Sequence, residues 1–161
     1  AARKVFADKR VFILGEIIHN PEVNRQIADM GIVNIVGHDR TAHVDGLTPD
    51  DVVIVPAFGT DVGTLARLKE SGVQIVDTTC GDVMKVWKRV RGYAKDGITS
   101  IIHGKAGHEE TQATASRALG DDGRGHYLIV LTLDETDAVC RYIREGGDKQ
   151  AFLDRFSHAG H

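Results

Sequence analysis

Cys80 is the residue of this chain best placed to bind a metal or to attack a substrate. It follows an apolar run at residues 73–76 and precedes a helical pattern at residues 82–95. Parallel α/β sheets bind ligands at the carboxyl ends of their strands, and a helix N-terminus favours the thiolate form of cysteine. The position predicts a reactive or metal-ligating thiol, although a buried structural cysteine fits the local sequence equally well.

His19 occupies a similar position earlier in the chain. It follows an apolar run at residues 11–14 and precedes Asn20 and Pro21, which read as the N-cap and first residue of a helix. A histidine beside a helix N-terminus can bind a phosphate or another anion. A loop histidine that hydrogen-bonds the cap is the simpler interpretation on local grounds alone.

A third group of polar residues lies at residues 102–111, where a strand gives way to a loop with two glycines and then to a helix. Lys105 and His108 next to this helix start form a plausible anion cradle. Glu109 and Glu110 complement the helix dipole in the ordinary way. A glutamate beside a bound anion also favours its protonated form and can deliver protons.

The elements that must position these residues alternate between strands and helices. Strands are predicted at residues 11–14, 32–36, 52–55, 73–76, 99–102 and 127–131, and helices at residues 21–30, 61–71, 82–95, 109–119, 134–145 and 149–157. Residues 37–50 read as an irregular connection. The alternation predicts an α/β fold of two consecutive doubly wound parallel-sheet units, residues 1–80 and 81–161, with the second unit short of strands. All the candidate residues then lie at strand carboxyl ends.

Composition narrows the class of protein. The 161 residues are 42% hydrophobic and 27% charged with a net charge of −3, which is a globular composition and argues against nucleic-acid binding. No apolar stretch approaches the roughly 20 residues that cross a membrane. With no secretory signal, the two cysteines read as reduced thiols, so we expect a cytoplasmic protein. Cys140 reads as core packing on the buried face of a helix.

Taken together, several short motifs resemble one family. They are Glu-Ile-Ile-His-Asn-Pro at 16–21, Pro-Ala-Phe-Gly at 56–59, Asp-Thr-Thr-Cys at 77–80, Lys-Val-Trp at 85–87, His-Gly-Lys at 103–105 and His-Glu-Glu-Thr at 108–111. Their order and spacing resemble the iron–sulfur 4-hydroxy-3-methylbut-2-enyl diphosphate reductases (LytB/IspH), in the plant and cyanobacterial-like branch. The match continues at residues 151–156.

The resemblance implies a role for each matched residue. Cys80 corresponds to the central of three cysteines that hold a [4Fe–4S] cluster, and His19 and His108 to the histidines that bind the substrate diphosphate. Glu110 corresponds to the acid that relays protons to the substrate hydroxyl. The implied reaction reduces an allylic diphosphate to isopentenyl and dimethylallyl diphosphate, with electrons from a ferredoxin or flavodoxin-type donor.

The chain also departs from the family pattern. The two other cluster cysteines and the third domain of the trefoil-like reductase are expected outside this chain, and Cys140 matches a position that is not a ligand. Phe58 stands where many bacterial members have a histidine, and Gly81 replaces a proline. We therefore expect an incomplete reductase, inactive alone.

Two alternatives remain open. One is a stand-alone phosphate- or diphosphate-binding module without a cluster, which would use His19, Lys105 and His108. The other, weaker alternative is a mononuclear metal site formed by Cys80, His103 and His108.

Overall fold

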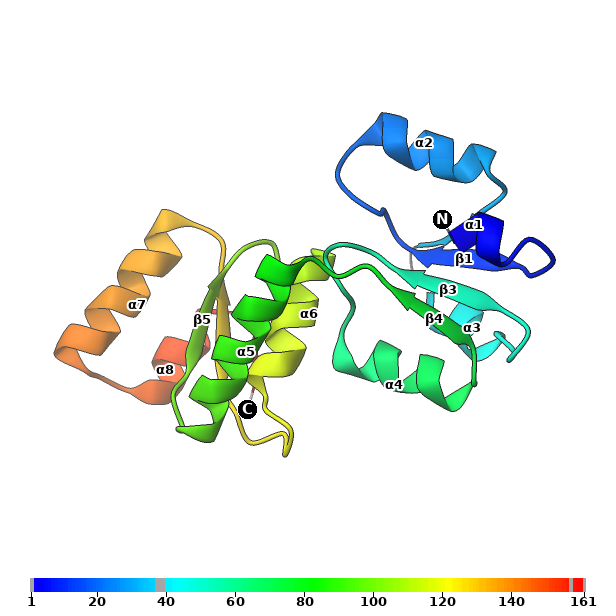
Figure 1. Ribbon diagram of the computed structural model, residues 1–161. Helices are drawn as coiled ribbons and strands as arrows, with labels where there is room; N and C mark the ends of the chain where they lie inside the picture. The colour runs from blue at the N-terminus through cyan, green and yellow to red at the C-terminus, as the bar shows by residue number, and fades with distance from the viewer. Residues whose placement is uncertain (1, 37–39, 157, 161) are drawn as a thin grey trace. The chain divides into compact units, whose positions relative to one another are not determined.

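The computed structural model describes residues 2–36, 40–156 and 158–160. The chain divides into two compact units, Ala1–Met84 and Lys85–His161 (Figure 1). The division falls inside α5 (Gly81–Lys95), a few residues after the predicted boundary at residue 80. Each unit carries its own sheet.

The first unit is built on four parallel strands in the order β2-β1-β3-β4. Its elements in chain order are α1 (Ala2–Val5), β1 (Val11–Leu14), α2 (Pro21–Asp29), β2 (Val33–Ile35), α3 (Arg40–Asp45), β3 (Val52–Val55), α4 (Val62–Glu70) and β4 (Gln74–Asp77). The four predicted strands are confirmed to within one residue at each end. The predicted irregular connection is wrong in part, because α3 occupies six of its residues; residues 37–39 of that segment lie outside the described part of the chain.

Helices cover both faces of this sheet. On one face, Leu14 and Val53 pack in a cluster with Val44 of α3 and Leu68 of α4. On the other face, Ile13, Val52 and Ile54 pack with side chains of α1 and α2 (Figure 1). All four residues of β3 are buried. A continuous Val-Val-Ile-Val run suits this central position, because a parallel strand between two helix layers needs apolar side chains on both faces.

An ion pair between the exposed Arg10 and the buried Asp51 lies at the amino ends of β1 and β3. Asp51 is fully buried and accepts two hydrogen bonds from the Arg10 guanidinium, at 2.7 and 2.8 Å. The backbone N–H and the hydroxyl of Thr48 also donate to Asp51. Burial alone would raise the pKa of Asp51, but the hydrogen bonds from Arg10 and Thr48 outweigh burial and hold this pKa below its usual value.

The second unit has a smaller, mixed sheet. After α5 come β5 (Ser100–His103), α6 (Glu109–Ala118), β6 (Tyr127–Val130), α7 (Leu133–Glu145), α8 (Lys149–Leu153) and β7 (Ala159–Gly160). β5 and β6 are parallel, whereas the short β7 runs antiparallel to β6. The prediction of a second purely parallel sheet is therefore wrong within the described residues. The last predicted helix ends at Leu153, and residue 157 lies outside the described residues.

Buried side chains of β6 contribute to the core of the second unit. Leu128 and Val130 of β6 pack with Val139 of α7 and Phe156. Between α5 and α6, the buried guanidinium of Arg117 lies 3.3 Å from the ring centroid of Trp87. This cation–π contact ties the two helices together. Within the described residues, no helix is both long enough and apolar enough to cross a membrane.

Candidate functional site

Three loops at the carboxyl ends of β1, β3 and β4 are joined by the backbone of a single residue, Ala57. The N–H of Ala57 donates to the carbonyl of Ile17, in the loop that carries His19. The carbonyl of Ala57 accepts from the N–H of Cys80 at 2.9 Å. The loops of His19 and Cys80 thus lie on one edge of the first sheet, as the sequence predicted from strand order.

The turn from β4 into α5 is held by hydrogen bonds at each residue. Both the N–H and the hydroxyl of Thr78 donate to the carbonyl of Val55, at 3.0 and 2.6 Å. Both the N–H and the hydroxyl of Thr79 donate to Oδ1 of Asp77, at 2.9 and 2.6 Å. The carbonyl of Cys80 accepts the first helical hydrogen bond of α5. The side chain of Cys80 is exposed, which excludes the structural alternative of a buried cysteine.

His19 lies on the loop after β1, immediately before α2. Its ring stacks on Phe58, with the ring centroids 4.3 Å apart, and its Nδ1 lies 3.3 Å from Oε2 of Glu16. Asn20, rather than His19, caps α2 by accepting from the N–H groups of the first turn. Stacking fixes the plane of the His19 ring, and the Glu16 carboxylate favours a proton on Nδ1.

His108 has a different local role, because it is itself the N-cap of α6. Its Nδ1 accepts from the N–H of Glu110 at 3.2 Å. Acceptance at Nδ1 places the proton of the neutral ring on Nε2, which makes that nitrogen a donor. The preceding loop is closely packed, since a Cβ on Gly104 would lie 2.8 Å from Oγ1 of Thr111. Any larger residue at position 104 would disturb the start of α6.

The predicted site residues thus form two pairs. Cys80 and His19 lie in the first unit, on loops joined through Ala57. His108 and Glu110 lie in the second unit, in direct contact through the helix cap. Their roles in binding and catalysis stay predictions.

Within the described residues, Cys80 is the cysteine on the loops of the predicted site. Exposed Cys80 has the donor chemistry and the accessible position that a cluster ligand needs. No group of three His, Cys, Asp or Glu side chains in the described ranges is arranged to hold a metal ion, which gives no support to the mononuclear site of Cys80, His103 and His108. Cys80 therefore fits as one of the ligands of such a cluster.

The prediction that Cys140 packs in the core is wrong. Ala138 and Val139 are buried on the inner face of α7, but Cys140 is exposed. Successive helical residues are rotated by about 100°, so the residue after a buried one readily turns toward solvent. Ile143, one turn further along α7, is also exposed.

Sequence reasoning missed the contacts that hold the site together. Phe58 was noted only as the replacement of a histidine, yet its ring orients His19. Ala57 carries no chemistry in its side chain, so its bridging role left no signal in the sequence. The only hint was its place between Pro56 and Phe58, in a strand-to-helix turn.

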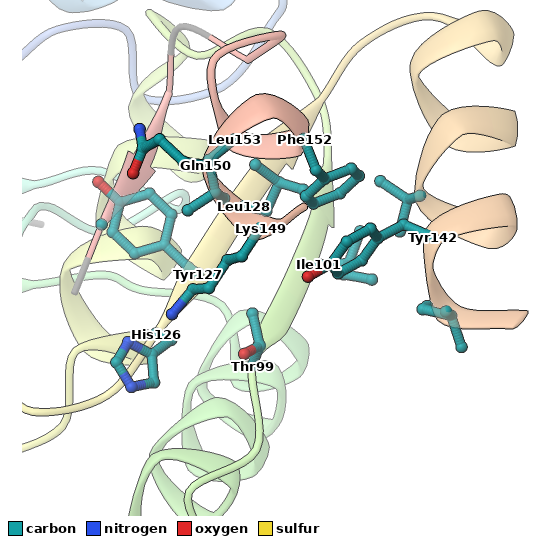
Figure 2. A pocket seen from close by; sticks show the side chains of 13 residues that line it. Thr99, Ile101, His126, Tyr127, Leu128, Tyr142, Lys149, Gln150, Phe152 and Leu153 are labelled. Atoms are coloured by element: carbon teal, nitrogen blue, oxygen red, sulfur yellow. The ribbon is translucent and has the colours of Figure 1, made fainter. Parts of the chain in front are cut away.

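A cavity of about 640 Å³ lies elsewhere, in the second unit (Figure 2). It is formed by the sheet, α7 and α8, and its mainly apolar walls are Thr99, Ile101, His126, Tyr127, Leu128, Val139, Tyr142, Ile143, Lys149, Gln150, Phe152, Leu153 and Gly160. Phe152 stacks on Tyr142 within it, with centroids 4.1 Å apart. None of the four predicted site residues lines this cavity.

Comparison with known families decides the relationship suggested by these loops. The family model described as LytB protein matches residues 1–153. The chain belongs to the LytB family. Among curated LytB relatives, the 4-hydroxy-3-methylbut-2-enyl diphosphate reductase of Thermosynechococcus vestitus (strain NIES-2133 / IAM M-273 / BP-1) is 47% identical over 157 residues, which is 98% of this chain and 38% of the relative. The reductase of the same name from Synechococcus sp. (strain RCC307) is 45% identical over 98% of this chain and 37% of its own length.

Solved structures agree at the level of the fold. A structure described as that of (E)-4-hydroxy-3-methyl-but-2-enyl diphosphate reductase, the terminal enzyme of the non-mevalonate pathway, matches 83% of this chain and 44% of its own with a TM-score of 0.66 and 24% identity. A Plasmodium falciparum reductase structure matches 84% of this chain and 40% of its own with a TM-score of 0.67 and 23% identity. This LytB chain therefore spans less than half the length of the proteins it matches.

Proposed function

We propose that this chain supplies two α/β units of an iron–sulfur 4-hydroxy-3-methylbut-2-enyl diphosphate reductase. The reaction removes the hydroxyl group of an allylic diphosphate as water, with two electrons and two protons, and yields isopentenyl and dimethylallyl diphosphate. The observation that carries the proposal is 45–47% identity to reductases of that name over 98% of the chain. Because the chain covers only 37–38% of those relatives, the activity is proposed for a longer protein.

His19 and His108 are proposed to bind the diphosphate. The cap geometry of His108 leaves Nε2 as the donor nitrogen, and the N-terminus of the ten-residue α6 adds a favourable field for an anion. His19 lies on a loop at the carboxyl edge of the first sheet, and its ring is stacked on Phe58. Two oriented donors fix a diphosphate more firmly than flexible lysines do, because less side-chain freedom is lost on binding.

Glu110 is proposed to supply protons to the departing hydroxyl. The backbone N–H of Glu110 donates a hydrogen bond to His108. The proposed proton donor and the proposed phosphate-binding histidine are therefore held together at the start of α6. A negatively charged substrate beside Glu110 favours the protonated carboxyl group, which is the form that can donate. Binding of the substrate therefore prepares the acid that the reaction needs.

Cys80 is proposed to ligate a [4Fe–4S] cluster, together with cysteines from outside this chain. Such a cluster supplies Lewis acidity at an iron atom and a path for electrons, which a ferredoxin or flavodoxin-type protein would deliver. The contribution of this chain is the rigid turn that presents the thiolate at the sheet edge.

A chimera tests the proposal. The aligned 157-residue segment of the Thermosynechococcus vestitus reductase is replaced by the corresponding part of this chain, and turnover is measured anaerobically with reduced viologen. We expect turnover and a cluster-type visible spectrum, both lost in Cys80→Ser and both retained in the matched control Cys140→Ser. An inactive chimera that folds and binds pyrophosphate without iron would instead support the stand-alone phosphate-binding module.

A further inference from the structure

The turn at residues 77–80 contains more side-chain hydrogen bonding than its surroundings require. Asp77, Thr78 and Cys80 are exposed, so water competes for their polar groups. The hydrophobic clusters of the first unit do not include Asp77. The hydrogen bonds of this carboxylate therefore serve the conformation of the turn itself.

The Asp77 carboxylate controls the residue immediately before Cys80. Its Oδ1 accepts both the N–H and the hydroxyl of Thr79. The hydroxyl bond is short at 2.6 Å, and the N–H bond is 2.9 Å. Thr79 is thus clamped at its backbone and its side chain by one oxygen atom.

The backbone of Cys80 is then fixed from both sides. Its N–H donates to Ala57, and its carbonyl accepts from the N–H of Met84 at 3.0 Å. With Thr79 clamped as well, the side-chain torsions of Cys80 are the main freedom left to its thiol. Preorganisation of this kind lowers the entropy lost when a ligand atom is captured.

We infer that Asp77 is a positioning residue for Cys80, acting through its double hydrogen bond to Thr79 to hold the thiol in the geometry that a cluster requires. The inference rests on the proposed function, because it takes Cys80 as a cluster ligand. Asp77 acts only through Thr79 and the backbone.

Three variants separate this role from general stability. Asp77→Ala removes the acceptor, Asp77→Asn keeps an Oδ1 that can accept both hydrogen bonds, and Thr79→Val removes only the hydroxyl donor. In the 161-residue chain, NMR hydrogen exchange reports the Thr79 and Cys80 amides directly. We expect at least about tenfold faster exchange at these two amides in Asp77→Ala, a smaller change in Thr79→Val, and near wild-type exchange in Asp77→Asn.

The second measurement uses the chimera and an iron chelator. Loss of an outer contact commonly weakens metal binding by about 10- to 100-fold, so we expect the visible cluster spectrum of Asp77→Ala to decay at least about tenfold faster. Asp77→Asn should decay like the unsubstituted chimera. Amides at the centre of β3 serve as the folding control and should exchange alike in all variants.

The two hypotheses fail in different ways. If Cys80→Ser keeps its cluster, the proposed function is wrong and the inference about the ligand fails with it. If Cys80→Ser loses its cluster but Asp77→Ala changes neither the two amides nor the chelator rate, only the inference is overturned. The same holds if Asp77→Asn behaves like Asp77→Ala, because the lost charge rather than the geometry would then be responsible. Should Asp77→Ala fail to fold, Thr79→Val decides the question alone: unchanged exchange and chelator rates overturn the inference.

Discussion

The two units share a parallel strand–helix–strand arrangement, β1-α2-β2 and β5-α6-β6, but extend it differently. In each, the glycine after the first strand donates its N–H to the last residue of the neighbouring parallel strand: Gly15 to Ile35, and Gly104 to Val130. β1 then has a strand on either side, whereas β5 pairs only with β6 in the described part of the second unit. All but one of the four residues of β1 are buried, but only Ser100 is buried in β5.

The two units also differ in how they hold His19 and His108. In the first unit Asn20 caps the helix, and the His19 ring stacks on Phe58. In the second unit His108 is the cap, and its Nδ1 accepts a hydrogen bond from the backbone N–H of Glu110. The same local arrangement thus yields one histidine oriented by stacking and another oriented by a helix. This comparison predicts that matched substitutions in the two units will have different effects on unfolding free energy and on catalysis.

The largest expected effect is on turnover. Glu110→Gln in the chimera should lower kcat by about 10²–10⁴-fold, the usual contribution of a general acid, while substrate binding is kept. Glu16 is the matched acid of the first unit, beside His19, and Glu16→Gln should act mainly on KM because it only supports a binding histidine. Steady-state kinetics with single-turnover controls measures both. If Glu110→Gln and Glu16→Gln lowered kcat equally, the proposal that only Glu110 donates protons would be contradicted.

The next effect compares the two sheets. Leu14→Ala empties a fully buried site between β1 and its helices and should cost about 2–5 kcal/mol of unfolding free energy. Ile101→Ala changes a side chain that is 47% exposed on β5 and should cost about 1 kcal/mol or less. Hydrogen exchange resolved by unit is the suitable measurement, since a two-unit chain need not unfold in one step. Similar costs would show that β5 is as well packed as β1.

The Arg10–Asp51 pair gives the first unit a specific response to pH. Because the folded-state pKa of Asp51 lies below its usual value of 3.8, its contribution to stability is present above that value and is lost as the pH falls through the folded pKa. Asp51→Asn should lower the stability of this unit by about 1–3 kcal/mol at neutral pH. Denaturant unfolding at pH 7 and near pH 3 should show the two proteins converging at acid pH. A constant difference would assign the effect to packing.

The smallest effect concerns a helix cap in the second unit. The hydroxyl of Thr132 accepts from the N–H of Glu135, and the Glu135 carboxylate accepts from the N–H of Thr132, which forms a capping box on α7. Thr132→Ala should cost about 1 kcal/mol, confined to the second unit, whereas Thr132→Ser should cost little. Exchange rates of the first-turn amides of α7 report the change. Faster exchange of the β1 amides in Thr132→Ala would contradict the expectation that the loss of stability is confined to the second unit.

The sequence predicted the helices and strands that are marked by a clear pattern of apolar side chains. Continuous apolar runs predicted β1 and β3, whose side chains are buried on both faces of the sheet. α3 is six residues long with a mixed pattern, and β7 has two residues including a glycine, so neither carries a periodic signal. Cys140 was wrong because one helical step separates a buried position from an exposed one.

The contacts around the predicted site residues were not predicted from the sequence. Strand order sufficed to place Cys80 and His19 on one edge, since parallel strands share their carboxyl ends. The clamp of Asp77 on Thr79 and the stack of His19 on Phe58 depend on loop geometry, for which the sequence has no comparable periodicity.

Ala57 has a practical consequence for mutagenesis. An alanine scan passes over it, because it is already alanine, and almost any other side chain would leave its N–H and carbonyl in place. Only proline lacks the N–H that reaches Ile17. Side-chain truncation therefore cannot measure how far these two hydrogen bonds hold the loops together, whereas Ala57→Pro removes the one to Ile17 directly.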